Sequence, residues 1–146
     1  MRVLRIMMAV PVIGLGLVAA PAHAAPAAAS PYHAVLSAAE EVPSPGPSGA
    51  TGTAKVTIDA AAGTLCYDLA WAPSTLSPSA AHIHKGAKGT SGPIVVLLNE
   101  PPQPKACVMA PSQVLQGIAA DPSGYYVNIH TNDHPGGAVR GQLVAG

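Results

Sequence analysis

Two histidines separated by one residue form the part of the sequence best suited to chemistry. His82 and His84 flank Ile83 in a segment of alternating character. Side chains alternate between the two faces of an extended strand, so both imidazoles point to one side and Ile83 points to the other. Neutral imidazole is a good ligand for zinc and copper. Two imidazoles on one strand face can therefore bind a single ion, or can share a hydrogen-bonded polar site.

A metal site needs at least one further ligand from another part of the chain. His130 lies in a second alternating segment, residues 124–131, which places it on the same face as Tyr126 and Asn128. His134 follows in the turn after that segment. The candidate cofactor is copper or zinc. The candidate metal ligands are His82, His84, His130 and His134.

A metal-free interpretation of the same histidines stays open. Histidines in a β-sheet can donate and accept hydrogen bonds across neighbouring strands, and such a polar network would close one end of the sheet. Its candidate members are Tyr126, Asn128, Arg140 and Gln142. No catalytic arrangement of a nucleophile with a base emerges. Glu40 and Glu41 are adjacent, so in an extended segment they point to opposite faces and make a poor acid and base pair.

Short β-strands separated by Pro- and Gly-rich turns would hold these residues. Alternation over residues 51–58 and 64–71, joined by a turn containing Gly63, predicts a β-hairpin. Further strands are expected at 32–38, 80–85, 93–99, 124–131 and 138–144. Ser112 is expected to be the N-cap of the one short helix. We therefore predict an all-β fold, an antiparallel β-sandwich or Greek-key barrel with at most one short helix.

The N-terminal segment has the pattern of a secretory signal peptide. Arg2 and Arg5 precede an apolar run, and small residues stand before a cleavage site near Ala24. The apolar run is shorter than the roughly 20 residues that span a membrane. We expect a cleaved signal peptide at 1–24, a disordered linker at 25–31 and one domain at 32–146. The mature protein would be secreted, extracellular or periplasmic, with no membrane span.

Charge and cysteine content agree with that location. Without the signal peptide the chain has five basic and seven acidic residues, a net charge of −2. It therefore lacks the basic surface that would recruit nucleic acid. Cys66 and Cys107 are the only cysteines, and an oxidising compartment permits a disulfide between them. Cys66 and Tyr67 lie on opposite faces of the predicted strand 64–71. We expect the bridge to tie the face that carries Cys66, or the edge of that strand, to a loop.

Several separate motifs, in order, resemble the CHRD domain, the repeated module of chordin that also occurs as a single domain in secreted bacterial proteins. The resemblance covers about residues 32–144 and implies an all-β extracellular domain. The growth-factor-binding cysteine-rich repeats that accompany the module in chordin have no counterpart in this sequence, so that activity does not carry over. The motifs are Glu40-Glu41-Val42-Pro43, Ala81-His82-Ile83-His84-Lys85-Gly86, Gly92-Pro93-Ile94-Val95-Val96, Tyr125-Tyr126-Val127-Asn128-Ile129-His130-Thr131, Pro135-Gly136-Gly137 and Arg140-Gly141-Gln142-Leu143.

A weaker resemblance is to copper/zinc superoxide dismutase, a β-sandwich with a His-x-His strand, a later strand histidine and an arginine near a Gly-rich C-terminus. His82, His84, His130 and Arg140 fall in that order. No histidine lies between His84 and His130 to bridge two metals, and Cys107 lies too early for that family's disulfide. The resemblance implies an immunoglobulin-like or superoxide dismutase-like sandwich.

Together these patterns predict a secreted CHRD domain that acts as a non-catalytic binding or structural module. Its partner would be an extracellular protein or a small ligand. The alternative function is a copper- or zinc-binding protein that uses the His-x-His pair with a further histidine. A superoxide dismutase-like redox enzyme built on the same site is the third possibility.

Overall fold

The computed structural model describes residues 29–73 and 76–146, so the predicted signal peptide and residues 25–28 of the predicted linker lie outside the described residues. Strands make up most of this part of the chain. They are β1 (Ser30–Ser37), β2 (Thr51–Asp59), β3 (Thr64–Ala72), β4 (Pro78–Lys85), β5 (Ile94–Leu98), β6 (Lys105–Met109), β7 (Tyr125–Thr131), β8 (Val139–Gln142) and β9 (Val144–Ala145). The helical elements are α1 (Ser112–Ala120) and the short 3-10 helices η1 (Ala38–Glu40) and η2 (Pro122–Gly124).

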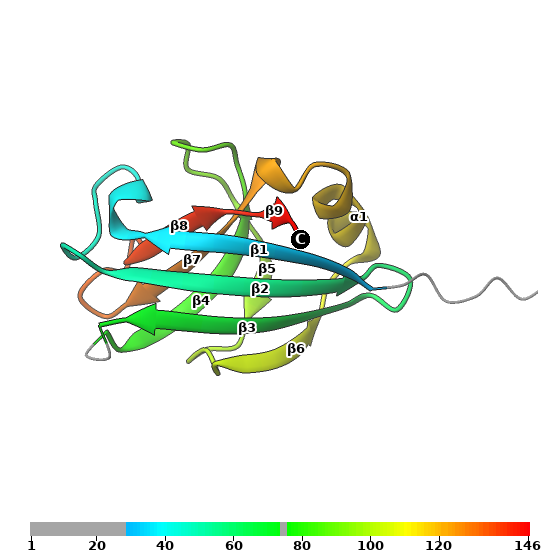
Figure 1. The fold of residues 1–146 in the computed structure, drawn as a ribbon, viewed down its shortest axis with the longest axis horizontal. Coiled ribbons are helices and arrows are strands. Elements are labelled where there is room, and N and C mark those ends of the chain that lie inside the picture. The colour runs from blue at the N-terminus through cyan, green and yellow to red at the C-terminus, as the bar shows by residue number, and fades with distance from the viewer. Residues whose placement is uncertain (1–28, 74–75) are drawn as a thin grey trace, which may run out of the picture.

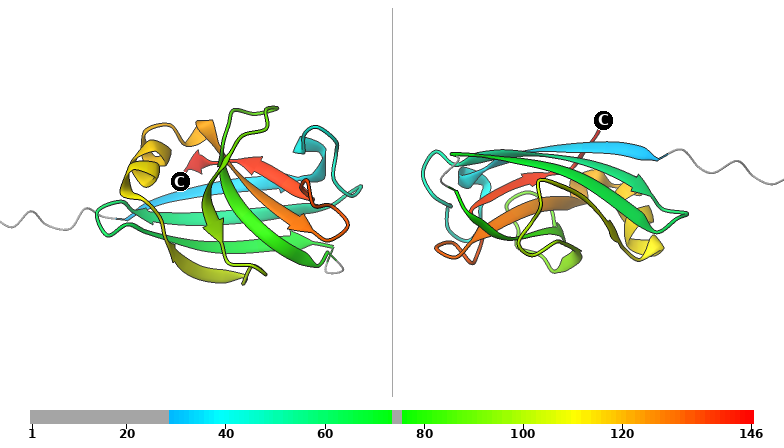
Figure 2. Two further views of the ribbon diagram at one scale, coloured as in Figure 1. Left: turned by 180° about the vertical axis from the view of Figure 1, so that it is seen from behind. Right: turned by 90° about the horizontal axis from the view of Figure 1, so that it is seen from below.

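All the strands belong to one antiparallel sheet that curls into two layers and nearly closes as a barrel. The strand order is β5-β4-β7-β8-β1-β2-β3-β6, and β9 pairs with β1. In Figure 1 the strands β1, β2 and β3 lie in front of β4, β5 and β7, and the second panel of Figure 2 shows the two layers from below. The helix α1 lies at one end of the sheet. The predicted all-β fold is confirmed, and α1 is the only α-helix in the described ranges.

Alternation places one face of the longer strands in a shared apolar core. In β2, Val56 and Ile58 are buried, whereas Lys55 and Thr57 are exposed. Ile83 of β4 is fully buried in the opposite layer. Burial of such apolar surface, at about 25 cal/mol per Å², is the main force that holds the layers together. Because the core uses only one face of β4 and β7, their other face is free to carry polar side chains.

The disulfide joins the sheet to its own edge strand. Cys66 and Cys107 are bonded, which confirms the predicted pair. The expected loop is in fact strand β6, in which Cys107 lies directly opposite Cys66 of β3. β6 was not predicted because it is five residues long, follows a Pro-rich segment and alternates only between exposed and half-buried positions.

Two element boundaries also differ from the predictions. β1 begins at Ser30, within the predicted linker, because Ser30 and Pro31 pair with residues of β2. In α1, Pro111 occupies the N-cap position and Ser112 is the first helical residue, so the predicted capping role of Ser112 is wrong. The helix ends at Ala120, and Asp121 begins the short turn into η2.

Candidate metal centre

Strand pairing brings three histidines together on the face of β4 and β7 that is turned away from the apolar core. His82 lies opposite Asn128, and His130 lies opposite Ala80, two residues before His82. One ring nitrogen from each of His82, His84 and His130 lies within 4.8 Å of the other two. His82 and His84 are buried and His130 is half-buried. The fold therefore joins three potential ligands from two strands at a site shielded from solvent.

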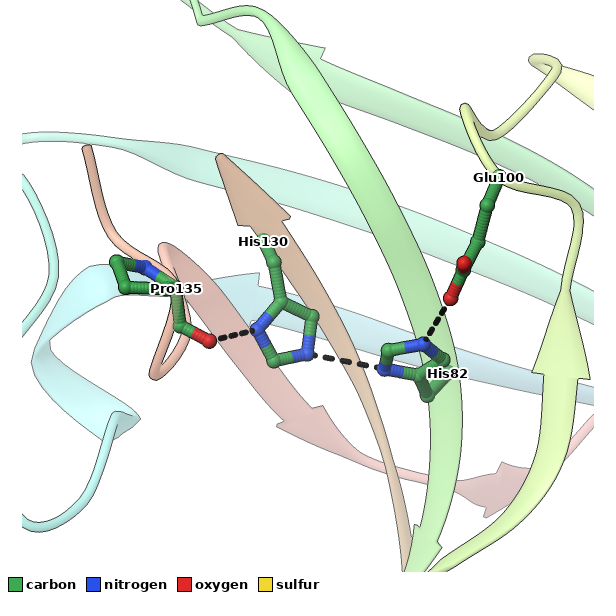
Figure 3. A network of polar contacts seen from close by, with 4 residues as sticks. All are labelled: His82, Glu100, His130 and Pro135. Atoms are coloured by element: carbon green, nitrogen blue, oxygen red, sulfur yellow. Dashed lines mark hydrogen bonds and ion pairs between the residues drawn. The ribbon is translucent and has the colours of Figure 1, made fainter. Parts of the chain in front are cut away.

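A hydrogen bond to an oxygen atom fixes each of these rings. The oxygens are Glu100 Oε1, 2.8 Å from His82 Nε2, the carbonyl oxygen of Gly92, 2.8 Å from His84 Nδ1, and that of Pro135, 2.9 Å from His130 Nδ1. Figure 3 shows the contacts of His82 and His130. A carbonyl or carboxylate oxygen accepts hydrogen bonds, so the nitrogen facing it carries the proton. The hydrogen bonds therefore assign the tautomer of each neutral ring.

The second nitrogen of each neutral ring then carries a lone pair. These nitrogens are His82 Nδ1, His84 Nε2 and His130 Nε2. His82 Nδ1 lies 3.1 Å from His130 Nε2. Two nitrogen lone pairs repel each other at this distance unless a proton or a cation lies between them. His84 Nε2 is buried and has no hydrogen-bond partner in the described part of the chain. A buried acceptor left unsatisfied costs about 1–3 kcal/mol, which a bound cation would remove.

Burial favours the neutral form of two of the rings. Desolvation lowers the pKa of His84, the hydrogen bond to Gly92 raises it less, and the charges of His82 and Arg140 lower it further. Desolvation also lowers the pKa of His130, against the hydrogen bond to Pro135. Neutral imidazole is the form that binds a metal ion. The surroundings therefore keep His84 and His130 in their metal-binding form.

Tyr126 and Arg140 stack beside His84. The Tyr126 ring is nearly parallel to the His84 ring, with centroids 4.8 Å apart and an interplanar angle of 7°. The Cζ atom of Arg140 lies 3.5 Å from the centroid of Tyr126. Arg140 is only 2% exposed, and its guanidinium donates to the carbonyl oxygens of Ala87 and Thr90 and to Oε1 of Gln142. The guanidinium is therefore bound inside the protein rather than presented to solvent.

The polar side chains predicted beside the histidines have mostly other partners. Asn128 donates to Glu41, and Gln142 donates to backbone carbonyl oxygens, among them that of Gly86. Tyr126, a member of the predicted network, stacks on His84 with ring centroids 4.8 Å apart. His82 and His130 are in contact through their ring nitrogens, whereas the ring of His84 lies closer to Tyr126 than to His82 or His130, whose centroids are 5.7 and 6.3 Å away.

The predicted fourth ligand, His134, lies outside the histidine cluster. Among the described residues, the group with converging ligand atoms contains only the other three candidates. The backbone N–H of His134 donates to Thr131, and its carbonyl accepts from Gly137, so this residue shapes the turn after β7. Its side chain lines a separate hollow with Asn132 and Asp133. The turn reverses the chain, and the alternation that orients His130 does not extend to His134.

Glu100 is a partner of the cluster that the sequence analysis missed. Glu100 follows the end of β5, in which Leu97 lies opposite His82. An acidic residue just beyond a strand that pairs with the His-x-His strand is the signal that could have identified it.

A buried carboxyl group lies on the same polar face. Glu41 is 5% exposed, and Asn128 Nδ2 donates to both of its oxygens at 3.1 and 3.0 Å. Gly137, at φ 137°, brings the turn backbone against this carboxyl group, where a Cβ atom would overlap it. Burial raises the pKa of Glu41 to about 7, although Arg140 and Asn128 act to lower it. Strand alternation gives no signal of this burial because Glu41 is the C-cap of η1 and does not lie in a strand.

We expect Glu41 to make the folded protein less stable as the pH rises towards neutrality. Its pKa of about 7 in the folded state lies above the ordinary value of 4.5. Between these values the folded state holds a proton that the unfolded state has lost. Below pH 4.5 Glu41 therefore makes its full contribution to the free energy of unfolding. Between pH 4.5 and about pH 7 this contribution decreases by up to about 1.4 kcal/mol per pH unit.

Urea unfolding of the wild type and of Glu41→Gln across this pH range measures the contribution. His84 and His130 act with the opposite sign because their pKa values are lowered, so the difference between the two proteins is the informative quantity. Glu40→Gln, at a half-buried neighbouring position, is the matched control and should follow the wild type. Parallel profiles for the wild type and Glu41→Gln would contradict the expectation.

The fold and this face define an all-β domain that carries a cluster of three histidines on one side of its sheet. The model of the CHRD domain matches residues 32–143. The chain therefore belongs to the CHRD domain family, as its motifs predicted. Comparison with curated proteins and with solved structures found no match. Within the described ranges, no helix has the length and apolar character needed to cross a membrane.

Proposed function

We propose that this CHRD domain binds one copper or zinc ion through His82 Nδ1, His84 Nε2 and His130 Nε2. The observations that carry the proposal are the convergence of one ring nitrogen from each histidine within 4.8 Å and the hydrogen bond at one nitrogen of each ring, which leaves the other nitrogen with a lone pair. Three imidazoles are a recurrent ligand set for these metals. Two nitrogens bound to one tetrahedral ion at about 2.0–2.1 Å lie roughly 3.3 Å apart. The corresponding distance between His82 and His130 is 3.1 Å.

The oxygen atoms around the rings support the same function. A metal-bound histidine usually donates its other N–H to a carboxylate or a backbone carbonyl, which fixes the ring and increases its basicity. Glu100 supplies the carboxylate here, and Gly92 and Pro135 supply the carbonyls. The three rings are therefore oriented for binding before an ion arrives.

The proposed activity is binding outside the cytoplasm, without a chemical reaction. The signal-peptide pattern and the disulfide between Cys66 and Cys107 support export. In the dismutase-like alternative, Arg140 would face an anionic substrate. Its guanidinium is instead buried and bound to backbone carbonyls, which favours a binding module over a redox enzyme.

Metal content tests the proposal. Metal-free protein is dialysed separately against zinc and copper, and bound metal is measured by elemental analysis. We expect one equivalent in each case. His134→Ala should bind the same amount, because His134 lies outside the cluster. Clearly substoichiometric binding of both metals by the wild type would overturn the proposal and favour the metal-free polar network.

Replacing Glu100 by alanine should weaken metal binding by about 10- to 100-fold, the usual effect of removing a partner of a metal-bound histidine. The carboxylate holds the proton of His82 on Nε2 and so keeps Nδ1 free. The Glu100 side chain is 54% exposed, so the stability of the metal-free protein should change by less than about 0.5 kcal/mol. Titration against a competing chelator measures the affinity.

Glu40→Ala is the matched control for this substitution. It removes another partly exposed carboxylate, which pairs with Lys88 and touches none of the three histidines. We expect it to keep the wild-type affinity. Equal affinities for Glu100→Ala and Glu40→Ala would show that Glu100 has no role at the metal centre.

A further inference from the structure

Residues 86–92, called loop 86–92 below, form most of the connection between β4 and β5 and are held by side chains of β7 and β8. Four of its backbone positions bind three side chains. Gln142 Nε2 donates to the carbonyl of Gly86 at 3.0 Å, Arg140 donates to the carbonyls of Ala87 and Thr90 at 3.0 and 2.7 Å, and Tyr126 Oη accepts from the N–H of Gly92 at 3.1 Å. The conformation of the loop therefore depends on these three side chains.

The last residue of this loop supplies the oxygen atom that orients His84. The carbonyl of Gly92 accepts the hydrogen bond from His84 Nδ1, while its N–H is bound to Tyr126. A Cβ atom at Gly92 would overlap the carbonyl group of Lys85, so this close backbone approach requires glycine. The position of Gly92 thus determines the tautomer of His84 and the direction of its Nε2 atom.

Arg140 is connected to His84 by two routes. Its guanidinium binds the loop carbonyls, and the loop ends at Gly92. Its planar face also lies against the Tyr126 ring, which stacks on His84. A guanidinium can donate in its plane to two carbonyls while its face contacts an aromatic ring, whereas the ammonium of lysine is a point charge without that geometry.

We propose that Arg140 is a positioning residue of the metal centre, which acts through the loop 86–92 and Tyr126 to hold His84 with its Nε2 atom free for the ion. The inference rests on the proposed metal-binding function. Arg140 does not touch the ion in this scheme. It fixes the neighbours that orient one ligand, as the partners of metal-bound histidines do in general.

Two control variants separate this role from general effects on the fold. Lys88 lies in the same loop and pairs with Glu40 at 2.9 Å, but its side chain is 70% exposed, and such pairs contribute little. Lys88→Ala therefore changes an exposed side chain of the loop and leaves the loop's buried hydrogen bonds in place. Val139 precedes Arg140 in β8 and belongs to the apolar core. Val139→Ala therefore destabilises the same strand from its other face.

The test uses two measurements on the full domain. Nitrogen-15 NMR of the metal-free protein reports which nitrogen of His84 carries the proton, and a chelator titration reports the affinity for zinc. For Arg140→Lys we expect loss of the single Nδ1-protonated tautomer and affinity at least about 10-fold weaker. Lys88→Ala and Val139→Ala should keep the wild-type tautomer and affinity. If Arg140→Lys does not fold, Tyr126→Phe removes only the acceptor of the Gly92 N–H, and the same two changes are expected in smaller degree.

The outcomes distinguish the two proposals. If the wild type binds zinc and both Arg140→Lys and Tyr126→Phe keep the wild-type tautomer and affinity, the positioning role is overturned and metal binding stands. An equal loss of affinity in Val139→Ala and Arg140→Lys would reveal a general effect of destabilisation and would also overturn the positioning role. A wild type that binds neither zinc nor copper would overturn both proposals.

Discussion

His84→Ala should abolish the proposed metal binding and, with it, the stabilisation that a bound ion would give to this protein. His84 Nε2 is buried and has no hydrogen-bond partner among the described residues, so binding of an ion at this site should depend on it strongly. In the wild type, metal at 100 times its dissociation constant should raise the free energy of unfolding by about 2.7 kcal/mol. For a domain of this size the melting temperature should rise by roughly 10 °C. The variant should show no such rise.

Thermal unfolding with and without zinc measures this effect. His33→Ala is the matched control, because His33 occupies an exposed position of β1, in the other layer of the sheet. It should respond to zinc as the wild type does. A similar rise in melting temperature for His84→Ala would show that the ion binds elsewhere and would contradict the proposed centre.

Removing the disulfide by the paired change Cys66→Ser and Cys107→Ser should lower the free energy of unfolding by about 4 kcal/mol. The two cysteines are 41 residues apart, and the chain-entropy model gives this value for a loop of that length. The loop contains β4 and β5, and the bridge holds β6, the edge strand, to β3. Urea unfolding of the oxidised wild type and of the double variant measures the difference.

Met109→Ser is a suitable control for this change, because Met109 lies in the same strand and is 75% exposed. It should alter stability by less than about 0.5 kcal/mol. A double serine variant within about 1 kcal/mol of the wild type would show that the β6 ladder holds this edge without the bridge.

Local periodicity predicted the elements well where a strand has one buried face. Alternation between buried and more exposed positions in β2 and β3 follows directly from the apolar core. Alternation also correctly placed His82 and His84 on one face of β4. Periodicity does not reveal which strands are neighbours. His82 and His130 are 48 residues apart, and only the pairing of β4 with β7 brings them into contact.

The contacts that orient the rings were harder to predict because loops provide them. Gly92 and Pro135 act through backbone carbonyls, which any residue type carries, so their identity gives no signal of that role. Glu41 is buried because the turn at Gly137 lies against it, an arrangement invisible to strand alternation. The partners of Arg140 are likewise carbonyl oxygens of a distant loop, which strand alternation does not reveal.

Anomalous diffraction from crystals of the protein prepared with zinc or copper tests the central claim most directly. Data collected at the absorption edge of the metal locate the ion independently of any assumed site. We expect one strong peak about 2.0–2.1 Å from His82 Nδ1, His84 Nε2 and His130 Nε2. No peak at these three nitrogens, with metal instead bound in the turn at His134 and Asp133, would contradict the proposed metal centre.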